Sequence, residues 1–88
     1  MVLRIRLSNL SWREVDGEVI ALDLDSSTYF SANRTGSLLW HAMVDGSTVD
    51  ELVVLLQKSF DIEEDAAHTD VHAFLKLLHQ NGLLARGG

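Results

Sequence analysis

Cysteine and proline are both absent from the 88 residues of this sequence. Without cysteine the chain has no disulfide, no thiol nucleophile and no thiolate metal ligand. Without proline, no stretch is typical of a rigid linker. Long apolar runs are missing as well, so no segment has the pattern of a membrane span. These absences favour one small unit that folds around an ordinary apolar core.

Basic residues are scarce too, since seven lysines and arginines stand against thirteen acidic residues, for a net charge of −6. An acidic protein repels phosphates, which excludes nonspecific binding to DNA or RNA. The N-terminal run from Met1 to Arg6 lacks the apolar stretch of a signal peptide, so we expect a cytoplasmic protein with no membrane partner. A chain of this length buries only about 60% of its unfolded surface, which leaves little room for a catalytic cleft. Composition therefore favours a binding module over an enzyme.

The first third of the chain alternates apolar and polar residues, which is the pattern of half-buried strands. Asp16-Gly17 is a strong hairpin signal, and Asp25-Ser26-Ser27 is typical of a second turn. The strands expected from this pattern are residues 12–15, 18–24 and 28–31, with an extra N-terminal strand over Leu3–Leu7. We predict an antiparallel meander.

From Asn33 onward the apolar residues recur at helical spacing, and three helices are expected. Strands followed by helices predict an α+β fold, here a three-stranded antiparallel sheet followed by three helices, of winged helix-turn-helix type. The start and stop signals are Asp45-Gly46 at the end of the first helix, the capping-box pair Thr48 and Glu51 at the start of the second, the similar pair Asp61 and Glu64 at the start of the third, and Asn81-Gly82 at its end.

The third expected helix is apolar on two sides. A second apolar strip contains Ala66, Ala73 and Leu77, and Asp70 lies between it and the main stripe. Either this second strip packs on another part of the fold, or it lines a groove for a partner. The main stripe, which suits core packing, consists of Ala67, Val71, Phe74, Leu75 and Leu78.

In a meander the third strand, around Ser27 to Ser31, lies at an edge of the sheet. Its unpaired amides and carbonyls are then a template onto which an extended peptide can add a strand. The alternative is that the Leu3–Leu7 strand or a helix covers this edge.

Histidines give the only metal-binding pattern in the sequence. His68 and His72 lie four apart on one helical face, as helical zinc ligands do, and Asp65 is a candidate third ligand. No HExxH pattern or cysteine strengthens this site, and polar residues commonly lie beside a core stripe. We therefore predict no metal and no cofactor, and we place His41 on the surface of the first helix.

Catalytic motifs are missing from the sequence, which has neither a Gly-x-Ser-x-Gly turn nor a phosphate-binding glycine loop. The acidic cluster Glu63-Glu64-Asp65 lies in the first turn of a helix, where it favourably meets the helix dipole. That helix carries acidic residues against a single Lys76, which is unsuited to a DNA groove. We predict no enzymatic activity and no nucleic-acid partner.

An ordered set of short motifs covers roughly residues 12–85. These motifs are Asp23–Asn33, Gly36, Leu39-Trp40, Asp45-Gly46, Thr48–Val53, Phe60–Ile62, Asp70-Val71, Phe74-Leu75 and Gly82–Leu84. In this order they resemble the PqqD family, which implies one PqqD-like recognition domain over residues 1–88 with a core at 12–85. We expect the extra strand within 1–8 and a flexible tail at 86–88.

PqqD-like domains are recognition elements for ribosomally synthesised precursor peptides that other enzymes modify. The resemblance implies that the leader segment of such a peptide binds as an added strand along the third strand, beside the third helix. The protein itself would do no chemistry and would present the peptide to a separate leader peptidase or cyclase. The leader-binding residues implied in this way are Ser27, Thr28, Tyr29, Phe30, Ser31, Asp70, Val71, Ala73, Phe74 and Leu77.

Two pathway types are compatible with this resemblance. The stand-alone form resembles the leader-binding proteins of lasso-peptide pathways, and it also resembles PqqD, which serves pyrroloquinoline quinone synthesis. The acidic, cysteine-free chain with its Leu3–Leu7 extension favours the lasso type. Ala32 replaces a larger aliphatic residue common in the family, and Ser26-Ser27 replaces a turn that often carries glycine. A winged-helix DNA-binding regulator is the less favoured alternative.

Overall fold

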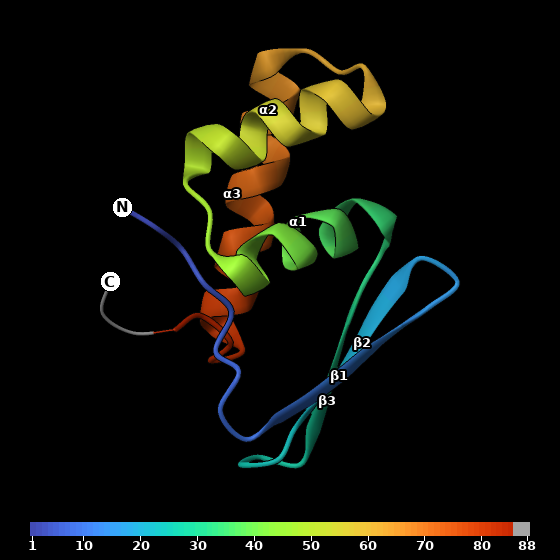
Figure 1. Ribbon diagram of the computed structural model, residues 1–88, viewed down its shortest axis with the longest axis vertical. Helices are drawn as coiled ribbons and strands as arrows, with labels where there is room; N and C mark the ends of the chain where they lie inside the picture. Colours follow the sequence, from blue (N-terminus) through green and yellow to red (C-terminus); the bar gives the residue numbers. More distant parts are fainter. Residues whose placement is uncertain (86–88) are drawn as a thin grey trace.

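The computed structural model describes residues 1–85, so the predicted tail at 86–88 lies outside the described residues. Within them, three strands precede three helices, which confirms the predicted α+β order (Figure 1). In the ribbon, α1 lies between the sheet and α2. No helix of residues 1–85 is long and apolar enough to cross a bilayer. The elements are β1 (Leu10–Val15), β2 (Glu18–Asp23), β3 (Thr28–Ala32), α1 (Arg34–Asp45), α2 (Val49–Phe60) and α3 (Glu64–Gln80).

The sheet is an antiparallel meander with the strand order β1-β2-β3, so β3 lies at an edge as predicted. In the first hairpin Asp16 and Gly17 have φ values of 53° and 81°. Two consecutive positive φ angles are typical of the type I′ turn that matches the twist of paired strands. In the second hairpin Ser27 has a φ of 57°, and the Asp25 amide donates to Asp23 Oδ1 at 3.0 Å. Both predicted turns are confirmed.

The core lies between one face of the sheet and the three helices. Val19 and Ala21 of β2 point into it, and Trp40 of α1 is buried at its centre. The buried hydroxyl of Ser37 ties α1 to the sheet, because it accepts from the Val19 amide at 2.7 Å and donates to the Ala32 carbonyl at 3.0 Å. This pairing satisfies backbone groups that would otherwise be buried without a partner.

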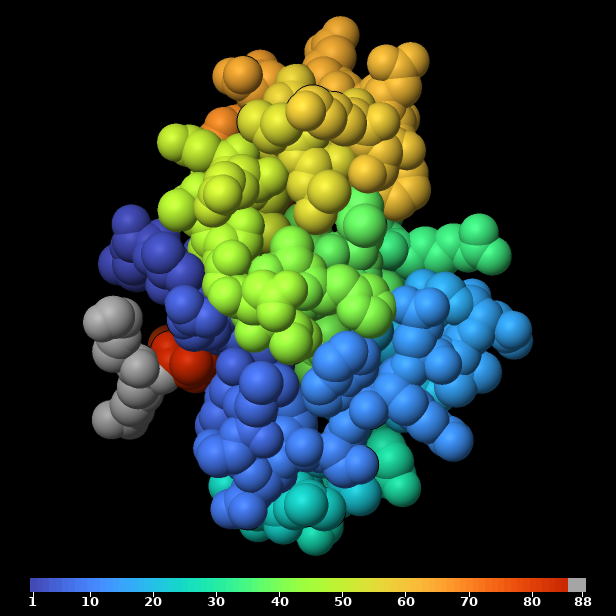
Figure 2. Space-filling model, viewed as in Figure 1, coloured from blue at the N-terminus to red at the C-terminus, as the bar shows by residue number. Residues whose placement is uncertain are grey.

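The N-terminal segment does not join the sheet, so the predicted extra strand over Leu3–Leu7 is wrong. Leu3 pairs with Ser47 just after α1, and Ile5 pairs with Leu84 after α3. Ile5 is buried, whereas Leu7 is exposed. The segment is extended, but it finds its hydrogen-bond partners at the ends of two helices. Figure 2 shows it (dark blue) against the chain that follows α3 (red).

The predicted start of the third helix at Asp61 is also wrong. Asp61 is the C-cap of α2, in a left-handed conformation with a φ of 51°, and its amide donates to the Gln57 carbonyl at 3.0 Å. The N-cap of α3 is Glu63, which makes no side-chain capping bond. Aspartate tolerates the left-handed conformation well, so the same residue type that favours a helix start here ends one.

Candidate functional site

The outer edge of β3 carries backbone groups that no other strand of residues 1–85 pairs. Along β3, Tyr29 and Ser31 are exposed on the face away from the helices, and Tyr29 is 74% exposed. Phe30 and Ala32 point to the helices. In an antiparallel strand every second residue directs its N–H and C=O to the same side. The outer edge of β3 therefore offers alternating donors and acceptors.

A groove of about 390 Å³ begins at Asn33, directly after the last residue of β3, and lies between the first turn of α1 and the exposed stripe of α3. From α3, Leu77 is 49% exposed and supplies an apolar wall, while Phe74 is only 7% exposed and lies deeper. Among residues 1–85, Asp70 is the one titratable side chain in the lining. The lining residues are Asn33, Thr35, Gly36, Leu39, Asp70, Ala73, Phe74 and Leu77.

Aromatic rings connect β3 to the groove and the core. Phe30 stacks on Trp40 with ring centroids 5.9 Å apart, and it meets Phe74 of α3 at 6.4 Å. Trp12 of β1 packs edge-on against Trp40 at 5.8 Å. Aromatic pairs at such distances favour offset or edge-to-face geometry, which fixes how the rings lie. The rings of Phe30 on β3, Trp40 on α1 and Phe74 on α3 therefore form one aromatic cluster.

The first turn of α1 approaches α3 closely because Gly36 has no side chain. A Cβ at Gly36 would lie 3.0 Å from Phe74 Cε1 and 3.1 Å from the Ala32 Cβ. Asn33 caps this turn, since its side-chain oxygen accepts from the Gly36 amide at 2.9 Å. The cap and the glycine together set the end of the groove next to the last residue of β3.

The structure brings most of the predicted leader-binding residues to one place. Asp70, Ala73, Phe74 and Leu77 line the groove, and the side chain of Val71 is fully buried in the core beneath it. The residues predicted on the strand lie at its edge or, for Ser27, in the preceding turn: Ser27, Thr28, Tyr29, Phe30 and Ser31.

Sequence reasoning missed the wall that α1 contributes. Asn33, Thr35 and Gly36 belong to the groove lining, and Leu39 lies behind them. The available signal was the spacing of Asn33 and Gly36, which is that of a helix N-cap and the amide it satisfies. That signal predicts a helix start, but it does not tell which other helix the turn faces.

The histidines do not form a metal site in the described chain. His68 and His72 stack with centroids 6.0 Å apart on α3, and no group of three His, Cys, Asp or Glu side chains among residues 1–85 is placed to hold an ion. The earlier candidate ligand Asp65 therefore does not complete a set with them.

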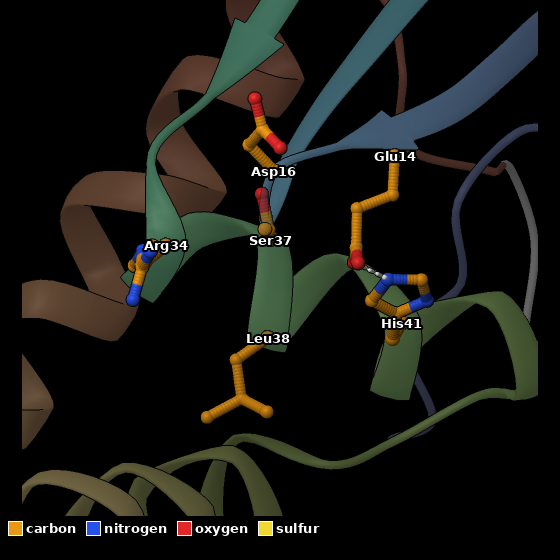
Figure 3. A pocket seen from close by; sticks show the side chains of 7 residues that line it. Glu14, Asp16, Arg34, Ser37, Leu38 and His41 are labelled. Carbon is orange, nitrogen blue, oxygen red and sulfur yellow. Dashed lines mark hydrogen bonds and ion pairs between the residues drawn. The ribbon is translucent and has the colours of Figure 1, made fainter.

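A second depression, of about 550 Å³, lies between the first hairpin and α1 (Figure 3). In it, His41 Nε2 lies 2.6 Å from Glu14 Oε1, which confirms the surface position predicted for His41. It is larger than the groove, but it is shallow, and it lies against the first hairpin rather than the unpaired edge of β3. We therefore regard the groove beside β3 as the candidate site.

Two solved structures are similar to this chain. One is described as "TbiB1 in Complex with the TbiA(beta) Leader Peptide", with a TM-score of 0.86 and 25% identity, over 97% of this chain and 98% of that chain. The other is "Lasso peptide synthetase B1 complexed with the leader peptide", with a TM-score of 0.83 and 25% identity, over 96% and 98%. No curated protein sequence matches the chain. The profile described as "Coenzyme PQQ synthesis protein D (PqqD)" matches residues 18–84, and the chain belongs to this family.

Proposed function

We propose that this protein binds the leader segment of a ribosomally synthesised precursor peptide as a fourth strand along β3. The observation that carries the proposal is the unpaired edge of β3 next to a groove walled by α1 and α3. Two similar solved structures are described as complexes with leader peptides, which supports the same ligand class for this chain.

The geometry divides recognition between backbone and side chains. Main-chain hydrogen bonds to β3 provide affinity that depends little on sequence, and alternate side chains of the added strand provide specificity. Those on the helix side enter the groove, where Phe74 and Leu77 accept apolar groups and Asp70 accepts a basic one. The net charge of −6 further disfavours strongly acidic leaders.

We infer that the protein presents the leader and leaves the chemistry to other proteins. A hydroxyl nucleophile is activated by an adjacent base, and among the described residues Asp70 is the one titratable side chain of the groove lining. A bound leader extends beyond the groove at both ends of β3, so a separate leader peptidase or cyclase can act on the remaining peptide.

Lasso-peptide biosynthesis is the pathway that we favour. Both similar structures are described as leader-peptide complexes, and one of them is named a lasso peptide synthetase B1. The alternative is a peptide chaperone of pyrroloquinoline quinone synthesis, because the matching family bears that description. The neighbouring genes distinguish the two, since a lasso pathway places a precursor, a leader peptidase and an amide-forming cyclase together.

The proposal is tested by titrating the protein with a fluorescein-labelled leader peptide of the precursor encoded beside its gene. We expect saturable binding at micromolar concentrations or below. Leu77→Asp should weaken binding about tenfold or more, because it places a charge in an apolar contact. Val54→Asp is the matched control, since Val54 on α2 is 46% exposed and Leu77 is 49% exposed, and we expect it to bind as the parent does.

No saturable binding up to about 100 µM would contradict the proposal, because affinities in that range correspond to marginal complexes. Equal losses in both variants would place the effect in the stability of the fold. A salt-sensitive gel shift with duplex DNA would instead favour the winged-helix regulator.

A further inference from the structure

The side chain of Arg6 connects segments that are far apart in the sequence, and the proposed function does not use it. Arg6 Nε donates to the Gly82 carbonyl at 2.8 Å, and Nη2 donates to Asp23 Oδ2 at 2.8 Å. Nη1 donates to the Ser8 carbonyl at 2.6 Å and lies 3.5 Å from Asp25 Oδ2. One guanidinium therefore joins the end of β2, the second hairpin and the turn after α3.

These partners lie outside the groove lining, but two of them are close to β3 or to α3 along the chain. Asp23 is paired directly with Thr28, the first residue of β3. Gly82 follows the C-terminal end of α3, little more than a turn beyond the groove residue Leu77. Arg6 thus links the strand residue that pairs with the start of β3 to the turn that follows the C-terminal end of α3.

Few direct contacts join β3 to α3 among residues 1–85. α3 packs chiefly on α2, and Phe30 of β3 meets Phe74 of α3 at 6.4 Å. The N-terminal backbone strengthens the link that Arg6 makes, because the Arg6 amide donates to the Leu83 carbonyl at 2.8 Å.

We propose that Arg6 is a positioning residue for the leader, which sets the separation of β3 and α3 that an added peptide strand requires. This inference rests on the proposed function. An added strand must lie about 4.8 Å from β3 while its side chains reach the groove. If the end of α3 moves relative to β3, both conditions cannot be met at once. If β3 and α3 are held in place before binding, the binding free energy does not include the cost of ordering them.

An arginine is suited to this role because its planar guanidinium has donors in a fixed fork. It reaches a carboxylate on one side and two carbonyls on the others at the same time. A lysine ammonium can keep the ion pair with Asp23 but cannot span all three directions. Arg6→Lys should therefore behave between the parent and Arg6→Gln.

The test measures two quantities in the same variants, the distance between the sheet and α3 and the affinity for the leader. Because the chain has no cysteine, Leu24→Cys and Lys76→Cys allow two spin labels on exposed positions, one in the turn between β2 and β3 and one on α3. Distance distributions are recorded by electron-spin resonance without peptide, and the labelled leader of the neighbouring precursor is then titrated. Arg4→Gln is the matched control, since Arg4 lies in the same segment but donates to the Asp45 carbonyl at the end of α1.

We expect Arg6→Gln to broaden the distance distribution and to raise the leader Kd about tenfold. Arg4→Gln should change neither, and Arg6→Lys should recover part of both. The inference is overturned if Arg6→Gln leaves either the distribution or the Kd within twofold of Arg4→Gln. If Arg6→Gln does not fold, Asp23→Asn takes its place, and its distance distribution and leader Kd are compared with those of Arg4→Gln in the same way. Failure of the parent protein to bind the leader would overturn the proposed function itself, whereas equal binding by parent and variant overturns only the role of Arg6.

Discussion

Asp23 is the buried carboxylate that pairs with Arg6. Its surroundings include one factor that raises its pKa and several that lower it. Burial alone raises the pKa of Asp23, but the hydrogen bond from Arg6, the amide of Asp25 and the positive charge of Arg6 outweigh it. The pKa of Asp23 is therefore held below its ordinary value of 3.8. Because the folded state favours the ionised form, the charged pair stabilises the fold at neutral pH.

This lowered pKa predicts how stability depends on pH. The contribution of Asp23 is complete above the ordinary pKa of 3.8, which the unfolded chain has, and it is lost as the pH falls through the lower pKa of the folded state. The stability difference between the parent and Asp23→Asn should therefore be constant from pH 7 to about pH 5 and should shrink below about pH 4. Urea unfolding at a series of pH values measures it. A difference that stays constant down to pH 3 would contradict the role of the charge.

Individual site residues differ in how far the sequence alone predicts them. The exposed stripe with Ala73 and Leu77 follows from helical periodicity, and so does the core position of Val71, which lies in the main apolar stripe. The groove wall at Gly36 does not follow from it, because periodicity describes one helix at a time. Only the tertiary packing shows that the first turn of α1 faces Phe74.

At the scale of elements, local chemistry predicted the hairpins and the start of α2 but not every boundary. The capping box of Thr48 and Glu51 is present in both directions, at 2.9 and 3.2 Å. Asp61 matched the same type of pattern and yet ends α2, because its backbone satisfies a carbonyl of the preceding turn. For Leu3–Leu7, alternation predicted the extended backbone, but the choice of hydrogen-bond partner depends on contacts far away in the sequence.

The capping box gives a prediction at this scale. Thr48→Ala removes the acceptor for the Glu51 amide and should reduce the free energy of unfolding by about 1 kcal/mol. For a chain of this size the melting temperature should fall by about 4–8 °C. Thr69→Ala is the control, since the Thr69 hydroxyl only donates to the Asp65 carbonyl within α3. We expect Thr69→Ala to change the free energy of unfolding clearly less than Thr48→Ala does. Neither variant should alter the leader affinity. Equal losses of stability would contradict the capping role.

At the scale of the whole molecule, the order of strands and helices predicted the arrangement that creates the site. A meander leaves two edges, β1 and β3, and the helices that follow it determine which of them has a groove beside it. The chain passes from β3 directly into α1, so the start of α1 stays near the last residue of β3. α3 then closes the other side through the contact of Phe74 with Phe30.

The presence of two edges allows a last prediction, on where the leader adds its strand. Both edges have unpaired backbone groups, but in the described part of the chain only β3 leads directly into the groove lining, at Asn33. Binding should therefore slow hydrogen exchange at alternate amides between Ser27 and Ser31, because a new strand pairs only the groups that face outward. The amides of Leu10–Val15 at the other edge should exchange at unchanged rates. Amide exchange followed by NMR, with and without the leader, measures both edges in one sample. Protection along β1 instead of β3 would place the leader on the wrong edge for the groove and would refute binding between β3 and α3.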